Sequence, residues 1–121
     1  MATLLIIDDE TDLRETISEL FIMVGYKVIE AVDGLDGLEK VKKSKPDLIV
    51  CDVMMPRLDG YGFLEQLKLT ENSNIPVIFI TARTEISDQE RGILLGARAY
   101  IIKPFSFKEL KWIVEYNLKD K

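Results

Sequence analysis

The stretch LIVCDVMMPRLDG, Leu48 to Gly60, joins a short apolar run to a carboxylate and a turn. Its first residues, Leu48 to Cys51, are apolar without interruption, as in a strand whose two faces are both covered. Asp52 ends that run with a charge, and a methionine pair, a proline and an Asp-Gly turn follow it. We therefore predict a buried strand over Leu48 to Asp52 that carries a carboxylate at its carboxyl end.

Outward from this strand, short apolar runs alternate along the chain with segments of helical period. Three of the runs are too continuously apolar for a strand with one face in water, which indicates a parallel sheet covered on both sides. The predicted strands are Thr3 to Asp8, Lys27 to Ala31, Leu48 to Asp52, Val77 to Thr81 and Ala99 to Lys103.

Helical signals fill the intervals between these strands. Apolar residues recur at helical spacing from Leu13 to Val24, and Gly25 can end that helix in a left-handed conformation. Weaker helical patterns run from Gly34 to Lys43 and from Gly60 to Leu69, where glycines reduce the helical propensity. These segments predict three helices.

Two further helices are predicted from their starting residues. Ser87 with Glu90, and Ser106 with Glu109, have the spacing of a capping box, in which each side chain satisfies a free backbone donor at the helix start. The chain thus contains five β-α units in succession. With right-handed crossovers, they predict an α/β fold with a doubly wound, five-stranded parallel sheet and five helices.

Size and composition narrow the possible functions. With 121 residues, 47% hydrophobic and 31% charged, the chain has the size of one domain, which we predict to span residues 1–121. The apolar runs fall far short of the ~20 residues of a membrane span, and the N-terminus lacks a signal-peptide pattern, which predicts a cytoplasmic protein that does not contact a membrane. A net charge of −5 argues against direct nucleic-acid binding.

Two residue types are informative because they are rare or missing. The chain has no histidine, which argues against a zinc site and against histidine-based acid–base catalysis. Its one cysteine, Cys51, lies within an apolar run, where we expect a buried core residue rather than a reactive thiol.

Polar residues close four of the predicted strands, at the edge where doubly wound sheets bind ligands. Each has an ordinary alternative role, such as capping a helix or covering apolar surface. Together they indicate a ligand site. Like unit charges ~4 Å apart, such as neighbouring carboxylates, repel by about 4 kcal/mol at an effective dielectric near 20, so a cation is expected among them. Magnesium fits best, since it binds carboxylate and carbonyl oxygens and often shares its shell with a phosphate. The residues are Asp8, Asp9, Asp52, Thr81 and Lys103.

Four short motifs at the ends of predicted strands carry a family resemblance. They are IIDDE (Ile6 to Glu10), DVMMPRLDG (Asp52 to Gly60), ITAR (Ile80 to Arg83) and AYIIKPF (Ala99 to Phe105). In this order and roughly this spacing, they resemble the receiver domains of two-component response regulators, over essentially the whole chain. The resemblance implies a flavodoxin-like sheet with strand order 2-1-3-4-5.

The resemblance also implies roles for the acidic residues. Asp52 is expected to be the phosphoacceptor, held rigidly by its strand for in-line attack on phosphorus. Asp9 and Asp52 are expected to be magnesium ligands, and Asp8 to hold metal-bound water. Met54 is expected to contribute its backbone carbonyl to the metal, and Mn²⁺ is expected to be able to replace Mg²⁺.

The remaining implied roles concern phosphate contacts and switching. Thr81 and Lys103 are expected to bind phosphoryl oxygens, and the Lys103-Pro104 peptide bond to be cis. Thr81 and Tyr100 are expected to form the switch that responds to phosphorylation, although a strand tyrosine can also simply pack against helices. Met54 and Arg83 occupy positions where the family varies and tunes the lifetime of the acyl phosphate.

The resulting hypothesis is a phosphorylation switch that catalyses only its own phosphorylation and slow dephosphorylation, and is regulatory rather than an enzyme. Its partners are expected to be a histidine kinase or histidine phosphotransfer protein, and a downstream protein or fused output domain bound by the last two helices and last strand. One alternative is a phosphatase or phosphotransferase with an aspartate nucleophile, in which Met54 replaces the usual second aspartate. Others are a flavodoxin-like cofactor binder and a receiver-like fold without phosphorylation.

Overall fold

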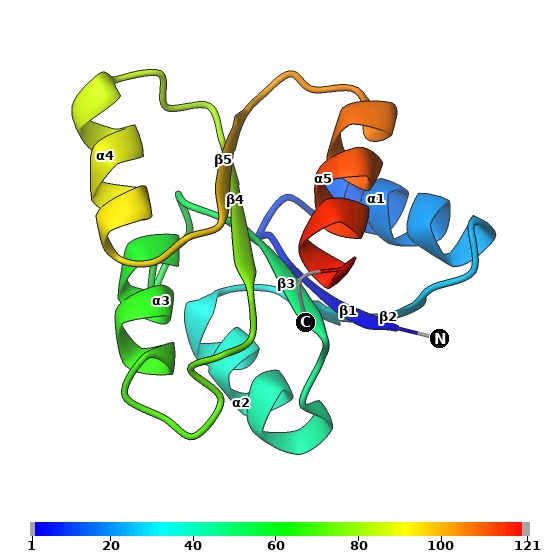
Figure 1. The fold of residues 1–121 in the computed structure, drawn as a ribbon, viewed down its shortest axis with the longest axis horizontal. Helices are drawn as coiled ribbons and strands as arrows, with labels where there is room; N and C mark the ends of the chain where they lie inside the picture. The colour runs from blue at the N-terminus through cyan, green and yellow to red at the C-terminus, as the bar shows by residue number, and fades with distance from the viewer. Residues whose placement is uncertain (1, 120–121) are drawn as a thin grey trace.

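The computed structural model describes residues 2–119, which form a single parallel sheet with helices on both sides (Figure 1). The strand order is β2-β1-β3-β4-β5, which confirms the predicted doubly wound α/β fold. In chain order the elements are β1 (Thr3–Ile7), α1 (Thr11–Met23), β2 (Lys27–Ala31), α2 (Gly34–Ser44), β3 (Leu48–Asp52), α3 (Gly60–Leu67), β4 (Val77–Thr81), α4 (Ile86–Leu94), β5 (Ala99–Ile102) and α5 (Phe107–Lys119).

The hydrophobic core lies in two layers, one on each face of the sheet. Successive residues of a strand point to opposite faces, so Leu4 and Ile6 of β1 pack toward α1 and α5, while Leu5 and Ile7 pack toward α2 and α3. Figure 1 shows α1 and α5 together on one side and α2, α3 and α4 on the other. All residues of β3 and β4 are buried, Cys51 among them, as their unbroken apolar runs predict.

Some element ends differ from the sequence prediction. Strands β1 and β5 each end one residue earlier than expected, so Asp8 and Lys103 are the first residues of the loops that follow them. Helix α2 extends to Ser44, one residue beyond the prediction, and α3 stops two residues short of Leu69. Gly25 follows α1 with a φ of 104°, which confirms the predicted left-handed end.

One of the two predicted capping boxes is wrong. Helix α4 begins at Ile86 with Glu85 as its N-cap, so Ser87 lies inside the first turn. The spacing of serine and glutamate that marks a capping box is also the ordinary i, i+3 spacing within a helix, so the motif did not fix the helix start. Ser106 does cap α5, because its Oγ accepts the Glu109 N–H at 3.1 Å.

Asp33, the N-cap of α2, ties two loops together at the carboxyl edge of the sheet. One carboxylate oxygen accepts the Asp36 N–H at 2.9 Å, and the other accepts a hydrogen bond from Arg57 in the loop after β3. Arg57 has a φ of 65°, a left-handed conformation that residues with a Cβ adopt at a cost. The ion pair therefore stabilises a strained loop that leads out of Asp52.

Asp33→Ala is expected to destabilise the domain by about 1 to 2 kcal/mol, because it removes a helix cap and leaves Arg57 unpaired. The matched control is Asp59→Ala, which removes the α3 cap, where Asp59 accepts the Gly62 N–H at 2.8 Å, and which breaks no ion pair among residues 2–119. The control should cost less. Urea unfolding of both variants measures the difference, and equal losses would contradict the added role of the ion pair.

The same comparison has a defined pH dependence. The hydrogen bond from Arg57 lowers the pKa of Asp33 below its ordinary value of 3.8. The stability that the carboxylate contributes is therefore fully present above that value and is lost as the pH falls through the lower pKa of the folded state. The gap between wild type and Asp33→Ala should accordingly shrink in strongly acidic buffer.

Candidate functional site

Three buried polar residues gather where β1, β3 and β4 end. Asp8 and Thr81 are fully buried and Asp52 is 3% exposed, although all three are polar. The parallel pairing of β3 with both β1 and β4 places their carboxyl ends side by side. The buried strands thus hold these side chains at one edge of the sheet, as the strand-end pattern predicts.

Lys103 is the cation that faces this cluster. Its side chain is 16% exposed, and its Nζ lies 3.2 Å from Asp52 Oδ2 and 3.6 Å from Asp8 Oδ2. The shortest contact, 2.9 Å, is to Oε1 of Glu10. Lys103 follows β5, and its peptide bond to Pro104 is cis. One ammonium group therefore neutralises part of the charge of three carboxylates.

The electrostatics of the cluster favour an added positive charge. Burial raises the pKa of Asp8 to about 7, a hydrogen bond from the Glu10 N–H opposes this, and the Asp52 charge adds to it. Burial also raises the pKa of Asp52, while Lys103 opposes the rise. Burial alone would lower the pKa of Lys103, but its hydrogen bond to Glu10 and the nearby carboxylates outweigh burial and raise it. The carboxylates are thus short of cationic partners.

The cluster fits a hard divalent cation. Carboxylate oxygens of Asp8, Glu10 and Asp52 lie within 4.8 Å of one another. Asp8 Oδ2 is buried and accepts no hydrogen bond from any residue that the structure describes. A buried oxygen without a donor, facing two more carboxylates, suits Mg²⁺ or Mn²⁺, which prefer oxygen ligands.

The two other residues proposed for the metal lie at the margin of this cluster. Asp9 is exposed and lines an adjacent cavity, so the structure does not bring its side chain into the group formed by Asp8, Glu10 and Asp52. The Met54 N–H donates to Asp52 Oδ1 at 3.3 Å, which places the Met54 backbone beside the site. Its side chain is half exposed.

Glu10 is the site residue that sequence reasoning missed. It is the N-cap of α1, yet its side chain makes no capping hydrogen bond and instead contacts Lys103. Glutamate is not among the preferred N-cap residues, and this mismatch at the end of the IIDDE motif is the signal that could have pointed to it.

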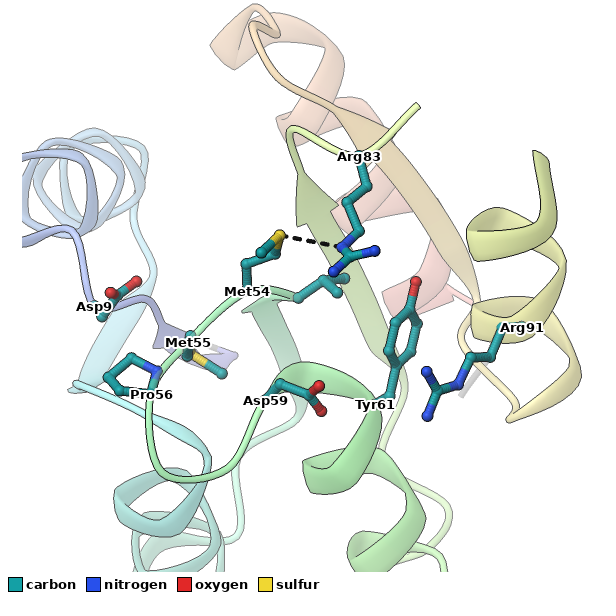
Figure 2. A pocket seen from close by; sticks show the side chains of 9 residues that line it. Asp9, Met54, Met55, Pro56, Asp59, Tyr61, Arg83 and Arg91 are labelled. Carbon is teal, nitrogen blue, oxygen red and sulfur yellow. Dashed lines mark hydrogen bonds between the residues drawn. The ribbon is translucent and has the colours of Figure 1, made fainter. Parts of the chain in front are cut away.

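A cavity of about 370 Å³ opens beside the cluster, shown in Figure 2. Arg83, from the loop after β4, reaches across it, and its Nε lies 3.1 Å from the Met54 sulfur. The same guanidinium lies 3.4 Å from the Asp88 carboxylate in α4. The lining residues are Asp9, Val53, Met54, Met55, Pro56, Asp59, Tyr61, Arg83 and Arg91.

The two proposed switch residues stand on neighbouring strands. Thr81 ends β4, and its Oγ1 accepts the Arg83 N–H at 3.1 Å. Tyr100 lies in β5, half-buried, with Phe79 as its partner across the strand pair. Its hydroxyl lies 3.2 Å from that of Tyr61 in α3. The described structure thus holds the Tyr100 ring against the interior.

These features agree with comparisons with known proteins. The chain matches the family "Response regulator receiver domain" over residues 4–115 and belongs to it. This regulatory family gives no support to the alternative of an aspartate-nucleophile phosphatase. No helix among residues 2–119 has the length and apolar character needed to cross a membrane.

Relatives and solved structures show the same likeness. A protein of Porphyridium aerugineum named "Probable transcriptional regulator ycf27" is 44% identical over 108 residues, which cover 89% of this chain and 44% of that protein. The chain therefore spans less than half the length of that relative. A putative response regulator from Chloroflexus aurantiacus is 33% identical with a TM-score of 0.91, and each chain is 98% covered. The receiver domain of a Francisella response regulator is 32% identical with a TM-score of 0.93, covering 99% of this chain and 98% of that one.

Proposed function

We propose that residues 1–121 act as one receiver domain that takes a phosphoryl group onto Asp52 in a magnesium-dependent reaction. The phosphoryl donor is a histidine kinase or a histidine phosphotransfer protein. The observation that carries this proposal is the Lys103 ammonium group, which lies 3.2 Å from the carboxylate of the buried Asp52 at the carboxyl edge of the sheet. That arrangement presents a fixed nucleophile beside a positive charge.

The geometry suits in-line transfer. An oxygen of Asp52 attacks phosphorus, and a new oxygen–phosphorus bond forms while the bond from phosphorus to the donor's leaving atom breaks. The Met54 N–H and Lys103 orient the two Asp52 oxygens from different sides, so little motion is needed before attack. Lys103 and the Thr81 hydroxyl then bind phosphoryl oxygens, and these charge-assisted bonds strengthen as charge builds on the transferring group.

The divalent cation has candidate ligands in the same group of residues. Asp8 and Asp52 of the cluster, with the Met54 carbonyl and with Asp9 from the margin of the cluster, would hold Mg²⁺ or Mn²⁺, and Glu10 adds a further carboxylate. When bound, the ion supplies positive charge that neutralises the phosphoryl oxygens. Because Asp8 Oδ2 has no hydrogen-bond donor within the described residues, a cation there satisfies a buried charge.

The output surface proposed for this domain is the face formed by α4, β5 and α5. Helix α4 exposes Ile86, Ile93 and Leu94. On α5, Trp112 and Tyr116 are exposed and stack with ring centroids 5.5 Å apart. Apolar side chains on neighbouring helices suit a protein partner, either a separate downstream protein or a fused output domain. Thr81 and Tyr100 couple this face to Asp52.

The experiment that tests this function uses acetyl phosphate as a small phosphodonor. With millimolar magnesium, intact-protein mass spectrometry should show the gain of one phosphoryl group, and chelation of the metal with EDTA should abolish it. The reason is that the crowded carboxylates repel an anionic donor unless a cation offsets their charge. No mass gain from acetyl phosphate or from any phosphorylated histidine donor, with magnesium present, would contradict the proposal.

A further inference from the structure

The Tyr100 hydroxyl is the first donor in a chain of two hydrogen bonds that runs through Tyr61 to helix α4. The Tyr61 hydroxyl donates to the Asp88 carbonyl oxygen at 3.0 Å, which uses its single proton. The hydroxyls of Tyr61 and Tyr100 are 3.2 Å apart, so the proton of that bond belongs to Tyr100 and Tyr61 accepts it. Tyr61 therefore provides the acceptor that allows the Tyr100 hydroxyl to lie against the interior.

Gly92 provides the space for the Tyr100 ring. It is buried in the last turn of α4, where glycine still has a lower helical propensity than alanine. A Cβ at this position would lie 3.1 Å from Tyr100 Cδ2, 3.3 Å from Tyr100 Cε2 and 3.2 Å from Phe79 Cδ2. Any other residue would press on the ring, so this glycine has a packing reason that outweighs its helical cost.

Tyr61 is itself held firmly, so it can position another residue. Its side chain is buried, and its ring meets the edge of Phe79 with centroids 5.6 Å apart. The guanidinium of Arg91, one turn beyond Asp88 in α4, lies 4.3 Å from the ring centroid, a cation–π contact. Figure 2 shows Tyr61 with Arg91 beside it, and both side chains line the cavity.

We propose that Tyr61 and Gly92 are positioning residues that form a seat for Tyr100 and set how much of the unphosphorylated protein holds this ring inward. The inference rests on the proposed function, in which Tyr100 belongs to the switch. The seat joins α3, α4 and β5 in one contact, so a change in the Tyr100 rotamer changes the α4–β5–α5 face. Phosphorylation can bias only an equilibrium that already exists, and the seat sets the fraction of unphosphorylated protein in which Tyr100 points inward.

Two substitutions weaken the seat in different ways. Tyr61→Phe removes the acceptor of the Tyr100 hydrogen bond, so the half-buried Tyr100 hydroxyl loses this partner and gains another by turning to water. Gly92→Ala places a methyl group against the ring and so disfavours the inward position of Tyr100. The same substitution raises the helical propensity of α4, so a weaker seat cannot be attributed to a weaker helix. Tyr26→Phe, at a half-buried tyrosine that packs against Phe21 outside the α4–β5–α5 face, is the matched control.

The first measurement is made on the unphosphorylated protein. Nuclear Overhauser contacts between the Tyr100 ring protons and the Gly92 Hα should be strong in wild type and in Tyr26→Phe, and much weaker in Tyr61→Phe. In Gly92→Ala, the contact from Tyr100 to the residue 92 Hα should weaken likewise. Wild-type contacts in both seat variants would overturn the proposal. This measurement needs no phosphorylation of Asp52, so it tests whether Tyr61 and Gly92 position Tyr100 even if the proposed function is wrong.

The second measurement is the affinity for beryllium fluoride with magnesium, a probe of the phosphorylated state. Each seat variant should bind it roughly five- to tenfold more weakly than wild type, because the inward state becomes less populated. In a Tyr100→Phe background, Tyr61→Phe should have no further effect, since Tyr61 acts through the Tyr100 hydroxyl. Unchanged affinity in both seat variants, or an equal effect of Tyr61→Phe in the Tyr100→Phe background, would overturn the role in switching. Failure of wild type to bind the probe would instead count against the proposed function.

Discussion

Asp52→Asn is expected to reduce labelling by acetyl phosphate at least about 100-fold, to below detection by intact-protein mass spectrometry. The amide is a poor nucleophile, and it also loses the charge that pairs with Lys103 at 3.2 Å. Asp59→Asn is the matched control, because Asp59 closes the same β3–α3 loop and lines the adjacent cavity. It should be labelled normally. Undiminished labelling of Asp52→Asn, mapped to another residue, would overturn the assignment of the phosphoacceptor.

The stability of Asp52→Asn shows whether a loss of labelling comes from the missing nucleophile or from an unfolded protein. The charge of Asp52 helps to raise the pKa of Asp8, so removing it relieves repulsion between two buried carboxylates. The melting temperature of Asp52→Asn without magnesium should therefore equal or exceed that of wild type. Magnesium is expected to stabilise folded wild type by mass action, and this increment should shrink in the variant, which has lost a candidate ligand.

Lys103→Ala is expected to lower the rate of labelling about 10²- to 10³-fold, the usual effect of removing one preorganised donor from a transition state. The Lys103 side chain is 16% exposed and contacts Asp8, Glu10 and Asp52, so the variant leaves three carboxylates facing one another. Without magnesium, stability should fall by about 1 to 2 kcal/mol, a loss limited by protonation of the carboxylates. Magnesium should restore most of it.

The control for this prediction is Lys111→Ala. Lys111 pairs with Glu115 one turn away on the surface of α5, at 2.9 Å, and such exposed pairs contribute little. It should be labelled at the wild-type rate and should melt at nearly the wild-type temperature with or without magnesium. Wild-type labelling of Lys103→Ala would exclude a role for its ammonium group in phosphoryl transfer.

The fold was largely determined by local patterns in the sequence. Unbroken apolar runs such as Leu48–Cys51 can only be buried on both faces, and five strand segments, three of them continuously apolar, alternate with helical segments, which leaves a covered parallel sheet as the consistent arrangement. The observed strand order is the one implied by the four motifs, and every predicted strand and helix is present. The same logic brought Asp52 and Lys103 to one edge, because parallel strands place their carboxyl ends together.

Tertiary structure alone decided which side chains meet at that edge. Sequence reasoning grouped Asp8 with Asp9 and Asp52, whereas the described structure groups Asp8 with Glu10 and Asp52 and leaves Asp9 exposed. The direction of a side chain in a loop depends on the partners that folding brings near it, here Lys103, which is 93 positions from Glu10 in the chain.

The same reason accounts for Tyr61 and for the start of α4. A tyrosine and a glycine near a helix end form no sequence pattern that indicates a shared contact, and only packing brings Tyr61, Gly92 and Tyr100 together. Ser87 has capping-box spacing, yet α4 begins one residue before it. Local patterns record preferences between neighbours in the chain. Contacts between distant residues depend on close packing of the whole interior, which no local pattern encodes.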